Sequence, residues 1–156
     1  MDKEASGFNT KQTVAIVGLG LIGGSYARGL RRLGVDHIIA VDPDEKALQQ
    51  AKQEGMVDDI YTAGTEALKQ ADLVIFCTAA DVMIRFLAEN KAFFTPGTIL
   101  TDVAGIKGDT ATAIAALLPE GVDFVPGHPM AGREGRGYGM ASADIFNGAN
   151  YILVPM

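Results

Sequence analysis

The regular alternation of short apolar segments with segments of helical period constrains the fold of this chain most. The apolar segments are continuous and rich in β-branched residues, which is typical of strands buried on both faces. The first two helical segments between them stop at glycine, at Gly34 and Gly55. Strands that alternate with helices are joined by right-handed crossovers. The sequence therefore predicts an α/β fold, with a mostly parallel sheet and helices on both of its faces.

The element boundaries follow from periodicity and from turn residues. The expected strands are 13–17, 37–41, 60–62, 73–77, 98–102, 122–125 and 151–154. The expected helices are 21–33, 44–54, 65–70, 81–89 and 109–118, with Asp44 and Thr65 as N-caps. A polar, glycine-rich loop is expected before the last strand. Residues 1–11 are polar and are expected to form a flexible leader before a single domain, 12–156.

Composition limits the classes of partner. The net charge of −6 argues against nucleic acid or an anionic membrane as the main partner. No apolar run approaches the ~18 residues that span a membrane. The single cysteine, Cys77, excludes an internal disulfide and fits a reducing, cytoplasmic setting. No metal site is expected, because two histidines and one cysteine cannot complete a zinc ligand set without carboxylates.

The ends of the expected strands carry the residues suited to a ligand site. In a parallel sheet of this kind, ligands bind beyond the carboxyl ends of the strands. The residues found at or after these ends are Gly18, Asp42, Thr78, Asp102 and His128. All five are glycine, polar or titratable, so this edge of the sheet is the expected location of the chemistry.

The first strand end matches the pattern G-x-G-x-x-G, directly before a helix. The predicted phosphate-binding turn consists of Gly18, Leu19, Gly20, Leu21, Ile22 and Gly23. The first glycine allows the tight turn, the second lets a pyrophosphate approach the backbone, and the third allows close packing of helix and strand. The N–H groups at the helix start would face the anion. We therefore predict a dinucleotide site in a Rossmann-like, doubly wound fold.

Asp42 and the end of a later strand extend this prediction. Asp42 lies 19 residues after Gly23, where an acidic side chain accepts hydrogen bonds from the adenosine ribose. A carboxylate there would repel a 2′-phosphate, so NAD is expected rather than NADP. The alternative is that Asp42 only caps the next helix. Thr78 and Ala79 are small and would let the nicotinamide half lie close, although an ordinary strand-to-helix turn would look the same. Cys77 is interpreted as a small buried hydrophobe.

His128 is the candidate base. It follows the strand 122–125 and lies between a glycine and a proline. Histidine titrates near neutrality and can therefore exchange a proton with a substrate. The alternative is a loop histidine that is hydrogen-bonded to the backbone. The other histidine, His37, begins an apolar strand and has no comparable setting.

With these motifs the chain resembles the N-terminal, nucleotide-binding domain of the prephenate and arogenate dehydrogenase family. The segments that carry the resemblance are 18–25, 101–103 with Lys107 and Gly108, 127–132 with Glu134 and Gly137, and 145–146 with 151–155. The glycine turn is shared with many dehydrogenases, whereas His-Pro-Met-Ala-Gly at 128–132 is much more specific. The resemblance covers nearly the whole chain.

The resemblance implies an activity and roles for several residues. It implies NAD-dependent oxidative decarboxylation of prephenate to 4-hydroxyphenylpyruvate, on the route to tyrosine. In such a reaction His128 would accept the hydrogen bond, and then the proton, of the substrate hydroxyl. Arg133 and Glu134 would lie at the mouth of the substrate pocket, and Lys107 matches the family segment. The alternative readings are a solvated ion pair for Arg133 and Glu134 and a surface lysine for Lys107.

The sequence departs from the family at two points. Gly105 stands where many members have a serine that helps to orient the histidine, so a water, Thr78 or Thr101 could serve instead. Family members also have a helical C-terminal domain that supplies the dimer interface and a substrate-binding arginine. The chain stops at Met156, so we expect a fragment that binds NAD with little turnover, from an enzyme that is a homodimer at full length.

Other functions remain open from the sequence. Arogenate dehydrogenase is the nearest alternative. A hydroxyacid or imine reductase would share the turn but leave the histidine segment unexplained. A non-catalytic NAD-binding or regulatory module is the alternative outside enzymes.

Overall fold

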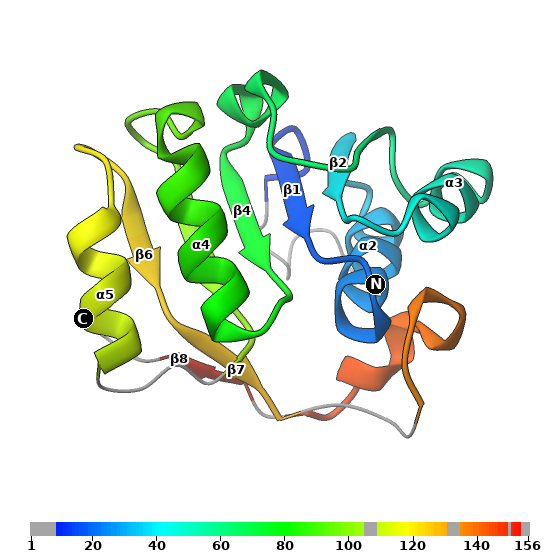
Figure 1. Ribbon diagram of the computed structural model, residues 1–156. Helices are drawn as coiled ribbons and strands as arrows, with labels where there is room; N and C mark the ends of the chain where they lie inside the picture. Colours follow the sequence, from blue (N-terminus) through cyan, green and yellow to red (C-terminus); the bar gives the residue numbers. More distant parts are fainter. Residues whose placement is uncertain (1–8, 105–108, 131–134, 150, 154–156) are drawn as a thin grey trace.

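The computed structural model describes residues 9–104, 109–130, 135–149 and 151–153, with only the backbone for 151–152. In this described part, six parallel strands form the main sheet in the order β3-β2-β1-β4-β5-β6 (Figure 1). They are β1 (Thr13–Val17), β2 (His37–Val41), β3 (Asp59–Tyr61), β4 (Leu73–Phe76), β5 (Ile99–Asp102) and β6 (Asp123–Val125). The order reverses between β1 and β4, which creates the ligand-binding crevice of doubly wound sheets. The predicted fold class is confirmed.

Helices cover the two faces of this sheet. They are α2 (Leu21–Leu33), α3 (Glu45–Gln53), α4 (Ala80–Asn90) and α5 (Asp109–Leu117). Figure 1 shows α4 and α5 in front of the sheet, and α2 and α3 belong to the other face. Alternate residues of β1 pack on opposite sides, with Ala15 and Val17 in the core under α4 and α5, and Val14 and Ile16 in the core under α2 and α3. This two-sided burial explains why the strands are apolar without alternation.

Most element boundaries match the expected ones. β1, α2 and β2 have the expected limits, and Asp44 caps α3 by accepting from the N–H groups of Lys46 and Ala47. The segment 65–70 is a 3-10 helix, η1 (Glu66–Gln70), and the side chain of Thr65 makes no capping hydrogen bond there. A short 3-10 turn, η2 (Lys91–Phe93), follows α4. Of the expected leader 1–11, residues 1–8 lie outside the described residues, and the carbonyl oxygen of Thr10 accepts from the N–H of Asp36 at 2.9 Å.

The region around His128 differs from the expected loop. β7 (Gly127–Pro129) pairs with β8 (Tyr151–Leu153) in an antiparallel ribbon apart from the main sheet, with His128 opposite Ile152. The expected loop also contains η3 (Tyr138–Met140) and η4 (Ala143–Phe146). The loop prediction for His128 was therefore wrong. The two strands of this ribbon are distant in sequence. Pro129 also has no N–H to donate to a neighbouring strand, so its presence argued against a strand at this position.

Candidate functional site

The glycine turn between β1 and α2 is so tightly packed against neighbouring backbone atoms that two of its positions have no room for a side chain. Gly18 has a φ of 98°, and a Cβ there would lie 2.7 Å from the carbonyl oxygen of Cys77. A Cβ on Gly23 would overlap the carbonyl oxygen of Gly18 and would lie 3.2 Å from the side chain of Ile16 in β1. Gly20 is the N-cap of α2, and the space that its Cβ would take is open. The turn therefore presents an accessible helix start, as a bound pyrophosphate requires.

Asp42 connects this turn to the next helix. Its Oδ2 accepts from the N–H of Leu19 at 2.6 Å, and its Oδ1 accepts from the N–H of Asp44 at 2.7 Å. The side chain of Leu19 is only 1% exposed and belongs to the core, so its backbone alone contributes to the turn. The N-cap of α3 is Asp44, so Asp42 does not merely cap that helix but links the glycine turn to the residue that does. A carboxylate offers about four acceptor positions, so both oxygens can still receive a ligand hydroxyl.

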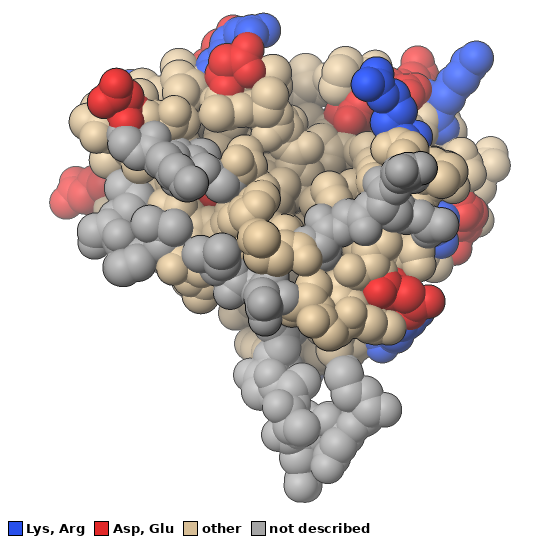
Figure 2. Space-filling view, turned by 90° about the horizontal axis from the view of Figure 1, so that it is seen from below, with Lys and Arg blue, Asp and Glu red and all other residues tan. Residues whose placement is uncertain are grey.

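A cavity of about 590 Å³ opens beside these residues, at the carboxyl ends of β1, β2 and β4. Gly18, Gly20, Asp42 and Thr78 line it, and Glu89 of α4 adds a second carboxylate. None of its described lining residues is lysine or arginine. Figure 2 shows this end of the molecule, where most of the visible acidic and basic side chains lie toward the margin.

The remaining predicted nucleotide residues lie next to this cavity. Leu21 and Ile22 form the first turn of α2, and Ala79 is the N-cap residue of α4. The hydroxyl of Thr78 donates to the carbonyl oxygen of Ala79 at 3.2 Å. Each helix start thus adjoins a residue that lines the cavity, Gly20 before α2 and Thr78 near the start of α4.

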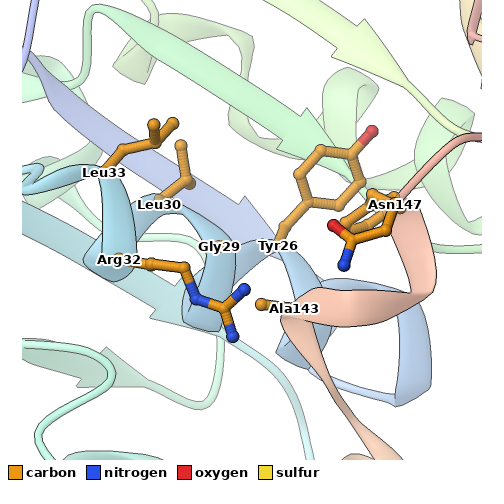
Figure 3. Close-up of a pocket in the computed structure, with 8 residues that line it drawn as sticks. Tyr26, Gly29, Leu30, Arg32, Leu33, Ala143 and Asn147 are labelled. Atoms are coloured by element: carbon orange, nitrogen blue, oxygen red, sulfur yellow. The ribbon is translucent and has the colours of Figure 1, made fainter. Parts of the chain in front are cut away.

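A second cavity of about 610 Å³ lies between α2 and η4 (Figure 3). Tyr26, Leu30 and Arg32 of α2 form one wall, and Ala143 and Asn147 belong to the other. None of the predicted site residues lines it. It is therefore separate from the candidate site.

His128 is oriented by a backbone carbonyl group. Its Nδ1 lies 3.0 Å from the carbonyl oxygen of Val103, just beyond β5. A carbonyl oxygen can only accept, so Nδ1 carries the hydrogen and the Nε2 of the neutral imidazole is left as an acceptor. The hydroxyl of Thr101 donates to Val125 at 2.7 Å, and that of Thr78 is engaged by Ala79. Neither threonine is therefore the partner of His128. The hydrogen bond to the backbone, which was the alternative expectation for His128, is present, but no sequence signal indicates which carbonyl group accepts it.

Asp102 lies beneath this arrangement and is 1% exposed. Its Oδ1 accepts from the N–H of Gly127 at 3.1 Å, and its Oδ2 accepts from the N–H of Ala104 at 3.0 Å. Burial raises the pKa of Asp102, although the two N–H donors and the nearby charge of His128 act to lower it. Burial and the Asp102 carboxylate raise the pKa of the Cys77 thiol, which agrees with its interpretation as a small buried hydrophobe.

Strand order brings the cavity and His128 to the same edge of the sheet. Cys77 and Thr78, at the end of β4, line the cavity. β5 pairs with β4, with Phe76 opposite Asp102, so Val103 and the imidazole that it holds lie one strand further along.

Some of the predicted residues are not covered. Lys107, Arg133 and Glu134, together with Gly105, lie outside the described residues. Within the described part of the chain, no group of three or more His, Cys, Asp or Glu side chains could hold a metal ion. No helix in that part is long and apolar enough to cross a membrane.

Known proteins resemble the chain in sequence and in fold. The model of the prephenate dehydrogenase nucleotide-binding domain matches residues 26–156. Prephenate dehydrogenase of Bacillus subtilis is 33% identical over 152 residues, which are 93% of this chain and 40% of that protein. Cyclohexadienyl dehydrogenase of Zymomonas mobilis is 29% identical over 143 residues, 91% of this chain and 48% of that protein.

Solved structures give the same result. The prephenate dehydrogenase of Aquifex aeolicus, in complex with hydroxyphenyl propionate and NAD+, has a TM-score of 0.86 and 26% identity over 97% of this chain and 52% of that chain. Synechocystis arogenate dehydrogenase has a TM-score of 0.82 and 31% identity over 92% and 50%. The chain thus spans about half or less of the length of these relatives. The chain belongs to the prephenate dehydrogenase family and corresponds to its nucleotide-binding domain.

Proposed function

We propose that this chain binds NAD and serves the oxidative decarboxylation of prephenate to 4-hydroxyphenylpyruvate, a step toward tyrosine. The observation that carries the proposal is the juxtaposition of two features at one sheet edge. One is the glycine-turn cavity with Asp42 at its side. The other is His128, whose Nδ1 is engaged by Val103 so that Nε2 is left as an acceptor.

The residues of the cavity fit a dinucleotide. The open space at Gly20 and the start of α2 would receive the pyrophosphate, and Asp42 would receive the adenosine ribose hydroxyls. Thr78 and Ala79 would lie along the nicotinamide half. Asp42 and Glu89 would repel a 2′-phosphate, and none of the described lining residues is a cation that could bind one. This charge pattern supports NAD over NADP.

The chain's own contribution to the reaction is the movement of a proton. Bound NAD would accept the hydride from the ring carbon that bears the hydroxyl. His128 Nε2 accepts the hydroxyl proton as the hydride leaves, because negative charge on the oxygen favours that departure. Loss of CO2 leaves its bonding electrons in the ring, which becomes aromatic, and His128 returns the proton to the phenolate oxygen. A positioned base of this kind supplies roughly 10²–10⁴-fold in rate.

Three further residues are proposed to contact the substrate. Arg133 would bind a substrate carboxylate bidentately, through two N–H groups of its guanidinium, and Glu134 and Lys107 would lie at the mouth of the same pocket. Glu134 and Lys107 are supported by the match of the sequence segments, whereas Arg133 stands at a variable position and is supported by its place next to them and by its charge. We expect Arg133→Ala to raise the KM for the substrate with little change in the affinity for NAD.

The setting of the enzyme is also a proposal. The net charge of −6 and the single cysteine support a cytoplasmic enzyme without a nucleic acid or membrane partner. The family resemblance supports a homodimer at natural length, which sedimentation equilibrium would test.

A titration of the 156-residue chain with NAD and with NADP tests the cofactor. We expect the chain to bind NAD more tightly than NADP. Asp42→Asn should narrow the difference between the two affinities, because it removes the carboxylate charge that repels the 2′-phosphate of NADP. Equal or tighter binding of NADP to the unaltered chain would refute the proposed preference.

Turnover by the protein at its natural length tests the reaction and the substrate. Prephenate and arogenate are compared by kcat/KM, because the 31% identical arogenate dehydrogenase makes that substrate the second candidate. We expect His128→Asn to lower kcat by roughly 10²-fold or more and to leave NAD binding nearly intact. Full turnover by this variant would remove His128 as the base.

A further inference from the structure

The end of β5 and the start of β7 are joined by a closed ring of hydrogen bonds that includes the candidate base. Asp102 accepts from the N–H of Gly127 and from the N–H of Ala104. Gly127 directly precedes His128, and Ala104 directly follows Val103, whose carbonyl oxygen lies 3.0 Å from Nδ1 of the imidazole. The carboxylate thus joins the residue before the imidazole to the residue after its hydrogen-bond partner.

We propose that Asp102 is a positioning residue for His128. By fixing both backbone segments, it holds the carbonyl oxygen of Val103 against Nδ1. It thereby keeps the neutral imidazole in the tautomer whose Nε2 can accept a proton. This inference rests on the proposed role of His128 as the base, and it adds how a chain with Gly105 in place of the usual serine keeps the ring oriented.

The position favours a carboxylate over an amide. Two N–H groups point at the same side chain, one at each oxygen, so two acceptors are needed. An asparagine would offer one acceptor and would turn its NH2 group toward the second N–H. A buried carboxylate is costly, and 1% exposure of Asp102 means that these N–H groups replace water for it. The cost is understandable if the pair of contacts fixes the geometry of the neighbouring imidazole.

A purely structural role would tie β5 to β7 and nothing more. Both roles predict some loss of stability when Asp102 is changed. Only the positioning role predicts a change in the tautomer of His128 in protein that remains folded. The tautomer is therefore the informative measurement.

The test uses ¹⁵N shifts of the imidazole nitrogens in the 156-residue chain, at a pH where the rings are neutral. We expect His128 to be mainly protonated on Nδ1, and Asp102→Asn to raise the fraction protonated on Nε2. His37 is an internal reference, because its ring contacts Asp59 and Thr13 at the amino ends of the strands, away from His128. Asp72→Asn is the matched control, since Asp72 also accepts from a backbone N–H, that of Thr13 at 2.8 Å, and loses the same charge.

Several outcomes would overturn the proposal. One is an unaltered chain in which His128 is mainly protonated on Nε2, a measurement that needs no variant. Another is a folded Asp102→Asn chain with an unchanged tautomer. If that variant does not fold, Asp102→Ala, which removes the opposing NH2 group, is measured in the same way.

Kinetics separate this inference from the proposed function. At natural length we expect Asp102→Asn to lower kcat by roughly 10–100-fold, as misplaced groups do, with KM and NAD affinity changed by less than about twofold. Absence of turnover in the unaltered enzyme would refute the proposed function but leave the tautomer result standing. An unchanged kcat in Asp102→Asn would refute the positioning role alone.

Discussion

At the scale of single residues, Gly23 shows how the lack of a side chain shapes the nucleotide turn. The carbonyl oxygen of Gly18 occupies the position that a Cβ on Gly23 would take, so the turn can pack directly against the helix. We expect Gly23→Ala to lower the free energy of unfolding by roughly 2–4 kcal/mol, since backbone atoms cannot move aside as a side chain can. The affinity for NAD should fall at least tenfold. Titration calorimetry measures this affinity, and urea unfolding measures the change in stability.

The same helix offers a matched control for that substitution. Gly29 lies in the middle of α2, and nothing lies within 4 Å of the place that its Cβ would take. Gly29→Ala should therefore stabilise the chain by about 0.5–1 kcal/mol through helix propensity and leave NAD binding unchanged. Retention of full NAD affinity by Gly23→Ala would contradict the assignment of the turn.

At the scale of elements, α2 supports the nucleotide turn and also the segment that follows His128. Ser25 is fully buried, donates to the carbonyl oxygen of Leu21 at 2.6 Å and accepts from the N–H of Ser142 at 3.0 Å. A Cβ on Gly24 would lie 2.7 Å from the ring of Tyr138, so η3 packs directly on the helix. The segment after the candidate base is thus attached to the helix whose first turn would bind the cofactor.

Ser25→Ala tests this attachment. Loss of the acceptor leaves the N–H of Ser142 without its partner, at a cost of about 1–1.5 kcal/mol. Amide exchange at Ser142 should then be roughly tenfold faster, while β1 amides, which depend on the main sheet, keep their rates. Unchanged exchange at Ser142 would show that other contacts hold this segment.

The comparison of sequence with structure also belongs to the scale of elements. The limits of β1, α2 and β2 were predictable, because each depends on a local pattern and a local stop signal such as Gly34. The β7–β8 ribbon was not, since its strands meet only through the fold. For the same reason the sequence pointed to His128 but not to its partner: a carbonyl group, such as that of Val103, is present at every residue.

At the scale of the whole molecule, a charged pair ties the sheet to its helix layer far from the candidate site. Asp58, just before β3, accepts from Arg31 of α2 at 2.8 Å and from the N–H of Ile38 in β2 at 2.8 Å. Desolvation acts to raise the pKa of Asp58, but both hydrogen bonds and the charges of Arg31 and His37 outweigh it, so the pKa lies below its ordinary value of 3.8. The ionised form therefore stabilises the fold.

The sign of the pH dependence follows from that direction. Because the folded pKa is below the unfolded one, the contribution is fully present above about pH 4 and is lost as the pH falls through the folded value. The side chain of Asp58 is 40% exposed, so solvent reduces the effect, and we expect Asp58→Asn to cost about 1 kcal/mol near pH 7. Urea unfolding from about pH 7 to about pH 2.5 should show the difference from the unaltered chain shrinking below about pH 4.

A double-mutant cycle with Arg31→Gln separates the ion pair from the bond to Ile38. The coupling between Arg31 and Asp58 should be measurable near neutrality and should approach zero in acid, where the carboxyl is neutral. The hydrogen bond from the N–H of Ile38 should persist both in Asp58→Asn and in the unaltered chain at acid pH, because asparagine and a protonated carboxyl each keep an acceptor oxygen. A coupling that stays constant over the whole pH range would mean that packing of the Arg31 stem, rather than its charge, ties α2 to the sheet.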